Sequence, residues 1–208
     1  MIANSAALKA GRRKKARENI VDAAIALLKE KDFSYFTVSN VCEAAGVSVG
    51  TFYHYFESIE ELLRAFFVKT YEVYAEERHM ERTGEPLNDL KLFFHSYFEF
   101  CEQQGLEFVR HFYDPHNTSL FNEVTLNAEE HFALPSLREA EQLIKKAQRQ
   151  GTLRSDVEAL TLAGDICTIE KGVMFEWCVS SGSIDAIAVA DRLVGGYLDS
   201  YRAKKEDV

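Results

Sequence analysis

TVSNVCEAAGVSVGTFYHYF, residues 37–56, decides the fold of this chain. The stretch reads as two short helices joined by a tight turn, because apolar residues in its first half recur at spacings of three and four. Thr37 is placed to cap the first helix, and Ser48 is placed to cap the second. Between them Gly46 ends the first helix, since glycine adopts the left-handed conformation without a Cβ penalty.

The second helix is expected to bury Val47, Phe52 and Phe56. Hydroxyl groups hydrogen-bond phosphate oxygens, and methyl groups of Thr and Val pack on the thymine methyl group, so an outward face of this composition predicts DNA binding. A helical hairpin with no nucleic-acid role is the alternative. The predicted DNA-binding residues of this stretch are Thr37, Ser48, Val49, Gly50, Thr51, Tyr53, His54 and Tyr55.

The segment AAGVSVGTFYHYFESIEELL, residues 44–63, resembles the DNA-binding signature of the TetR family of bacterial transcriptional regulators. This resemblance implies a sequence-specific DNA-binding protein, and it adds Ser39, whose position often reaches a base in the family. The matching residues are Gly46, Ser48, Gly50, Thr51, Tyr53, Phe56, Ser58, Glu61 and Leu62.

Two residues depart from the family pattern. Asp32 stands where a glycine commonly follows the lysine, and a small loss of stability is expected because aspartate tolerates a left-handed cap less well. Ile59 stands where many members place a phosphate-binding lysine, so one charge contact is missing. Farther along, KKAQRQGTLRSDV, residues 145–157, resembles the join before the last two helices of TetR-family bodies.

The net charge of −9 argues at first against DNA binding, because affinity for a polyanion comes largely from Lys and Arg. The distribution of charge reverses this argument. Residues 1–56 contain eight basic and five acidic residues, a net charge of +3, and residues 57–208 therefore carry −12. The sequence thus predicts a head that is drawn to DNA and a body that stays off it.

A basic run lies near the N-terminus, at Arg12, Arg13, Lys14 and Lys15. We expect it to act as an arm that contacts phosphates or reaches an adjacent minor groove, with a solvated helix start as the alternative. Residues 1–11 are small, polar or basic, and we expect them to be disordered without DNA.

The chain has 47% hydrophobic residues and no apolar run of 18 or more, so neither a membrane span nor a secretory signal is indicated. We expect a cytoplasmic location. Four cysteines lie inside apolar helical patterns without a CxxC pair, which favours reduced, buried thiols. A redox role for Cys167 and Cys178 is the alternative.

The rest of the chain reads as helical, without β-type alternation, repeats or low-complexity tracts. Ser58 and Glu61 form a capping box for the helix that joins head to body. The expected helices beyond the head pair span about residues 16–31, 58–82, 88–104, 106–113, 121–132, 135–150, 157–179 and 183–202.

No catalytic motif is present, so an enzyme is not expected, and neither is a cofactor or a metal. A cluster of His95, His111, His116 or His131 with Glu99 or Asp114 would reopen metal or acid–base chemistry. The aromatic residues of the middle region suit either a solid core or a cavity for a small hydrophobic or aromatic effector. The candidate pocket residues are Phe94, Tyr97, Phe98, Cys101, Phe108, Phe112, Phe121, Met174 and Phe175.

The last two helices carry broader apolar faces than one subunit can bury, and small residues among them permit close helix approach. A two-fold four-helix bundle, with both helices from each of two subunits, would bury the surplus apolar surface, because the same patch is covered on each subunit. We therefore expect a homodimer. The candidate interface residues are Leu162, Ile166, Val173, Ile187, Val194, Leu198 and Tyr201.

Together these features predict an all-α protein of about nine helices. Residues 1–56 form a three-helix DNA-binding head with its basic arm, and residues 57–208 form a six-helix body for effector binding and dimerisation. The resemblance implies a regulator of a pseudo-palindromic double-stranded operator, more readily a repressor released by a ligand than an activator. A constitutive dimeric regulator without an effector is the alternative.

Overall fold

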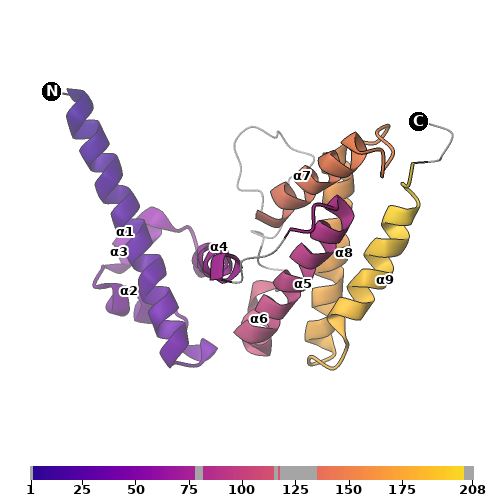
Figure 1. Cartoon of the computed structure of the whole chain (residues 1–208). Helices are drawn as coiled ribbons and strands as arrows, with labels where there is room; N and C mark the ends of the chain where they lie inside the picture. The colour runs from indigo at the N-terminus through magenta and orange to yellow at the C-terminus, as the bar shows by residue number, and fades with distance from the viewer. Residues whose placement is uncertain (1, 78–81, 115–116, 118–134, 204–208) are drawn as a thin grey trace. The chain divides into compact units, whose positions relative to one another are not determined.

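The computed structural model describes residues 2–77, 82–114, 117 and 135–203, and the side chains of these residues from position 15 onward. Nine α-helices occur in this described part of the chain, joined by turns and one short 3₁₀ helix (Figure 1). The same residues contain no β-strand, only an isolated bridge between Leu153 and Arg202. The all-α class expected from the sequence is confirmed.

The chain divides into two compact units, Met1–Thr70 and Tyr71–Val208. The first unit contains α1 (Ile2–Glu30), η1 (Phe33–Tyr35), α2 (Val38–Ala45), α3 (Val49–Tyr55) and the first part of α4 (Ile59–Glu77). Its core joins side chains from all four α-helices and from the residues that end η1 and α3. These core residues are Ile20, Val21, Ala24, Phe36, Val41, Cys42, Phe52, Phe56, Leu62, Leu63, Phe66 and Phe67.

Two expectations about the first unit were wrong. Helix α1 begins at Ile2 and not near residue 16, because residues 2–11 contain several good helix formers and no proline, and a single interior glycine costs only about 1 kcal/mol. Asp32 adopts an extended conformation with φ −62° and leads into η1, so no left-handed cap is needed there. The expected cost of aspartate at this position therefore does not arise.

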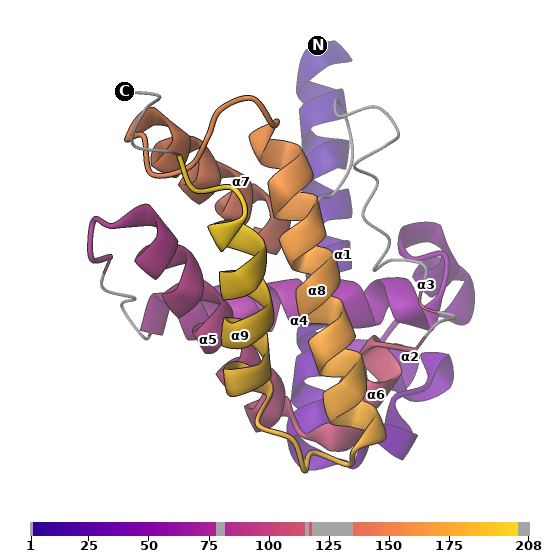
Figure 2. The ribbon, with the colours of Figure 1, turned by 90° about the vertical axis from the view of Figure 1, so that its right-hand side faces the viewer.

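The second unit contains the end of α4 and five further helices. Figures 1 and 2 both show α8 and α9 lying side by side, with α5 and α7 packed near them. The helices are α5 (Pro86–Gln104), α6 (Leu106–Phe112), α7 (Pro135–Arg149), α8 (Ala159–Val179) and α9 (Ala186–Asp199).

Most predicted boundaries in this unit fall within three residues of the observed ones. Helix α5 starts two residues early, because Pro86 occupies its first position, where a missing N–H costs nothing. Gly105 ends α5 with φ 86°, as expected for a residue that redirects the chain. The predicted helix at 121–132 and the end of the connecting helix at 78–81 lie outside the described residues.

Side-chain bonds hold the end of α8 in place. The Arg110 guanidinium on α6 donates to the Cys178 carbonyl from Nε at 3.2 Å and from one Nη at 3.1 Å. It also donates to the Ser181 hydroxyl at 2.9 Å, where the chain turns toward α9. Trp177, the single tryptophan of the chain, is buried beside this turn and packs against Gly182.

Among the described helices, none is both long and apolar enough to cross a membrane.

The turn between α2 and α3 depends on Gly46, which adopts φ 64°. We expect Gly46→Ala to lower the free energy of unfolding by about 1–2 kcal/mol, because a Cβ is disfavoured in the left-handed region. No atom lies within 4 Å of the added Cβ, so conformational strain is the expected cause. Chemical denaturation monitored by circular dichroism measures the change.

Gly50→Ala is the matched control, since Gly50 lies in helical α3 and its Cβ would meet only the Ser48 hydroxyl, at 3.8 Å. This variant should equal or exceed the wild type in stability. Equal stability of the two variants would show that the turn does not require a left-handed residue.

Candidate nucleic-acid interface

The α2–α3 pair is built by the capping residues that the sequence predicts. The Thr37 hydroxyl accepts a hydrogen bond from the Asn40 backbone N–H at 3.3 Å, and α2 follows. The Ser48 hydroxyl accepts from the Thr51 N–H at 3.1 Å and pairs with the Thr51 hydroxyl at 2.9 Å. Both caps are confirmed, and they satisfy backbone donors that would otherwise be left open at each helix start.

Helix α3 buries one side and exposes the other. Phe52 and Phe56 are fully buried, with ring centroids 5.7 Å apart. On the opposite side Tyr53 is 55% exposed and Val49 is 48% exposed. Val49 and Tyr53 lie one helical turn apart, so together they form an exposed apolar and aromatic patch of the kind that marks an interaction site.

The remaining predicted residues of this face differ in exposure. Gly50 and His54 are exposed, as are Thr37, Ser39 and Ser48 around the two helix starts. Thr51 and Tyr55 are half-buried, so each has part of its side chain on the exposed face and part covered by the rest of the unit. The structure therefore brings the sequence-predicted residues of α2 and α3 together in the first unit.

Contacts that the sequence analysis did not anticipate fix this pair on the unit. The Asn19 side chain on α1 donates to the Ala45 carbonyl at the end of α2, at 3.0 Å. The Asn40 side chain donates to the Tyr35 carbonyl at 2.9 Å, which ties α2 to η1. Side-chain amide contacts of this kind leave no periodic signal in the sequence, so only the structure identifies them.

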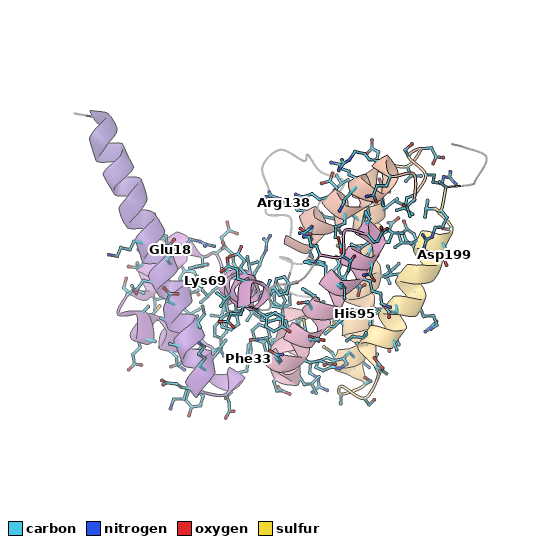
Figure 3. The ribbon with its side chains drawn as sticks, in the orientation of Figure 1. Glu18, Phe33, Lys69, His95, Arg138 and Asp199 are labelled. Atoms are coloured by element: carbon cyan, nitrogen blue, oxygen red, sulfur yellow. The ribbon has the colours of Figure 1, made fainter. Side chains whose placement is uncertain are left out.

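Two cations also hold the unit together. The Arg17 guanidinium lies 4.7 Å from the centroid of the Phe56 ring, a cation–π contact at the end of α3. The Lys69 ammonium on α4 lies 2.5 Å from an Asp22 carboxylate oxygen on α1, and Figure 3 labels Lys69 in this unit. The first contact holds the end of α3 against α1, and the second joins α4 to α1.

The predicted basic arm lies on α1. Lys15 is exposed, whereas the side chains of Arg12, Arg13 and Lys14 lie outside the described set. Their backbone is helical within α1, so the run belongs to an extended helix. Its contact with phosphate stays a prediction.

Residues 20–66, which span the end of α1, the α2–α3 pair and the start of α4, match the family model described as bacterial regulatory proteins, tetR family. The N-terminal unit of this chain is therefore similar to bacterial regulatory proteins of the tetR family. A comparison with curated protein sequences gave no match.

Several solved structures share the fold of this chain. FadR of Thermus thermophilus, a transcriptional repressor solved with lauroyl-CoA, is 20% identical with a TM-score of 0.70, covering 92% of this chain and 98% of its own. SmeT, the repressor of the Stenotrophomonas maltophilia multidrug efflux pump SmeDEF, is 21% identical with a TM-score of 0.53, covering 92% and 93%. FadR of Bacillus halodurans is 17% identical with a TM-score of 0.53, covering 89% and 99%.

The described residues that were predicted to line an effector pocket do not surround one cavity. The hydroxyls of Tyr97 and Tyr113 lie 2.5 Å apart in the aromatic core. Phe94 lines a pocket between α5 and α9, whereas Phe175 is 47% exposed on α8 and lines a separate hollow beside α6. Phe121 lies outside the described residues. The predicted residues that are buried are Phe94, Tyr97, Phe98, Cys101, Phe108, Phe112 and Met174.

The predicted interface residues also divide into groups. Leu162, Ile166 and Val173 are buried inside the subunit, because they form the side of α8 that faces its own core. Leu198 is buried and Val194 half-buried, and both line the pocket on the α5 side of α9. Ile187 and Tyr201 are half-buried.

A different set of apolar residues is exposed on α8 and α9. Phe175 and Val179 on α8 are 47% and 64% exposed, and Leu193 on α9 is 41% exposed. Gly172 and Gly196 lie on the same helices, with no atom within 4 Å of an added Cβ. The sequence pattern placed an apolar face on these helices but could not separate its inner side from its outer side.

The alternative chemistries have little support in the described residues. Within them no three His, Cys, Asp or Glu side chains come together as a metal site, while His116 and His131 lie outside the description. All four cysteines are buried and free of disulfides. Burial raises the pKa of the Cys167 thiol to about 12, so little reactive thiolate exists near neutral pH.

Proposed function

We propose that this chain is a TetR-family transcriptional regulator, which binds a pseudo-palindromic DNA operator through α3 and acts as a repressor that a small molecule releases. The observation that carries the proposal is the outward side of α3, where Tyr53 and Val49 are about half exposed on a helix whose other side is fully buried. A tyrosine hydroxyl suits phosphate, and a valine methyl suits a thymine methyl.

The charge distribution supports a separation between a DNA-binding N-terminal part and a remainder of the chain that does not bind DNA. Residues 1–56 carry a net positive charge and the remaining chain a strongly negative one, so the field of the protein favours approach to DNA by its N-terminal part. We assign DNA binding to residues 1–56, and dimerisation and ligand binding to residues 57–208.

A dimer would explain the exposed apolar residues of α8 and α9. An isologous contact lets Phe175, Val179 and Leu193 of one subunit pack against the same helices of a second subunit, and Gly172 and Gly196 allow close approach. Such an interface would bury about 2,000 Å² or more in total, as obligate dimers do. Two α3 helices would then enter successive major grooves, about 34–36 Å apart.

Ligand release rests on a different kind of support. The Thermus thermophilus FadR structure holds lauroyl-CoA, and SmeT was solved with triclosan, so two proteins of this fold bind small molecules that carry an apolar part. The dimer would have two states, one in which the spacing of the two α3 helices fits successive major grooves and one in which it does not. A ligand that binds the second state more tightly would shift the dimer toward it and so weaken DNA binding.

Three substitutions test the assigned face of α3. Tyr53→Phe should weaken binding by a few-fold on all sequences, because a phosphate contact carries no sequence information. Thr51→Ala and Val49→Ala should change which sequences are preferred, since base-edge contacts specify. Selection of bound DNA from a random pool, followed by affinity measurements, reads out both effects.

Val73→Ala is the matched control, because Val73 on α4 is also 48% exposed but lies outside α2 and α3. It should leave affinity and preference unchanged. Unaltered binding in all three α3 variants would rule out this docking face.

The basic arm is tested by salt dependence. Replacing Arg12, Arg13, Lys14 and Lys15 together by Gln should reduce the steepness of log K against log salt by about 0.9 for each phosphate that the arm no longer neutralises. The control replaces four basic residues of α7, which are Arg138, Lys145, Lys146 and Arg149. An identical slope in the arm variant and the wild type would mean that the run is only a solvated helix start.

The dimer is tested by placing charge on its proposed interface. Phe175→Glu with Leu193→Glu should give monomers in sedimentation experiments and abolish tight operator binding, because two unpaired charges per subunit would be buried. The control pair, Val73→Glu with Leu92→Glu, adds the same charge at exposed apolar residues outside α8 and α9. A dimer that persists in the first variant would mean that another surface holds the subunits together.

A further inference from the structure

A pocket of about 440 Å³ lies between α5 and α9 in the second unit. This volume lies within the range of small-molecule sites, which are mostly apolar with a few placed polar groups. Leu90 and Phe94 of α5 and Val194 and Leu198 of α9 provide apolar lining. Figures 1 and 2 show the two helices that form its sides.

One polar group in this pocket has an unusual environment. Glu170 of α8 lines the pocket but is only 4% exposed. Its Oε2 atom is buried and accepts or donates no hydrogen bond within the described part of the chain. A buried carboxyl group without a partner is costly, so a ligand that supplies the missing bond gains binding energy from it.

The other charges of the pocket determine which ligand fits. Lys91 Nζ lies 2.7 Å and His95 Nε2 lies 2.8 Å from the carboxylate of Asp191 on α9. Arg202 Nε lies 3.2 Å from a carboxylate oxygen of Asp199, and Figure 3 labels His95 and Asp199 on α5 and α9. Every basic side chain that lines the pocket is therefore already bound to an acid.

The acidic groups, in contrast, exceed these cations. Glu170 and Glu85 also line the pocket, and neither lies within 4 Å of a basic group among the described residues. The described lining of the pocket thus offers an unmatched carboxyl group and no free cation. An anionic ligand would meet repulsion there, whereas a cation would be attracted.

We infer that this pocket binds an apolar ammonium compound, whose nitrogen pairs with the Glu170 carboxylate while its hydrocarbon part packs on Phe94 and the aliphatic lining. The inference deepens the proposed function, on which it rests for the view that the bound molecule regulates DNA binding. Binding itself is a property of the second unit and is measured without DNA.

Pairing with an ammonium group changes the protonation of Glu170. Burial, and secondarily the nearby charge of Asp191, raises the pKa of Glu170 to about 8, so without a ligand this group is largely protonated at neutral pH. The ammonium ligand favours the ionised form, and Glu170 then releases its proton to solvent. The charged groups lining the pocket around it are Glu85, Lys91, His95, Asp191, Asp199 and Arg202.

Three eight-carbon probes separate the charge from the apolar part of the ligand: octylammonium, 1-octanol and octanoate. In calorimetric titrations of the full chain at pH 7, octylammonium should bind about tenfold or more tightly than 1-octanol, and octanoate more weakly still. Titrations in two buffers of different ionisation enthalpy should show proton release with octylammonium alone. Equal affinity of the amine and the alcohol would overturn the inference.

Glu170→Gln keeps the shape of the side chain and removes its charge. Its affinity for octylammonium should fall about 10- to 100-fold, with little change for 1-octanol. Glu176→Gln, which removes an exposed carboxylate six residues along α8, is the control and should bind like the wild type. Undiminished amine binding by a folded Glu170→Gln protein would also overturn the inference.

A second pair of variants locates the site without altering any charge. Gly195 lines the pocket and has no atom within 4 Å of an added Cβ, so Gly195→Leu should fold and block octylammonium. Ala188→Leu adds the same kind of side chain at an exposed residue of α9 that does not line the pocket, and this variant should bind the amine normally. Octylammonium binding that survives Gly195→Leu would place the ligand elsewhere.

The two levels of the proposal fail separately. If octylammonium binds as described but does not change operator affinity, the pocket stands and its role as the effector site is wrong. If the chain does not bind DNA at all, the proposed function fails while the calorimetric results still decide the chemistry of the pocket.

Discussion

The burial of Phe52 and Phe56 is the constraint on which the DNA-binding unit depends. Both rings are fully enclosed on one side of a seven-residue helix, and a helix this short has no stable orientation in isolation. Their burial therefore determines which side of α3 faces outward. The contacts of Asn19 with Ala45 and of Arg17 with the Phe56 ring secure the same orientation from α1.

The local features of this unit could be predicted because they are written in neighbouring residues. Thr37, Gly46 and Ser48 each act within three or four positions of their partners, and each was identified from residue type and spacing alone. The start of α1 was not predicted correctly. A basic, polar segment resembles a disordered tail in composition, although its alanines and lysines are good helix formers.

In the second unit the helices could be predicted from the sequence, but the direction in which their side chains face could not. Its helices could be placed to within a few residues, but the inner and outer sides of α8 and α9 could not be separated, because both sides are apolar. The signal for Glu170 was nevertheless present. It lies four residues after Ile166 and three before Val173, within the buried stripe of α8, and an acidic residue in such a stripe indicates a polar site inside the fold.

The position of Trp177 gives the chain a built-in optical label. Because it is the single tryptophan, and lies buried against Gly182 beside the turn that Arg110 holds, the intrinsic indole fluorescence of the chain originates at one corner of the second unit. Phe175 and Val179, within two residues of it, are among the exposed apolar residues of α8. Indole emission therefore senses the polarity of this corner directly, while the N-terminal unit contributes no such chromophore of its own.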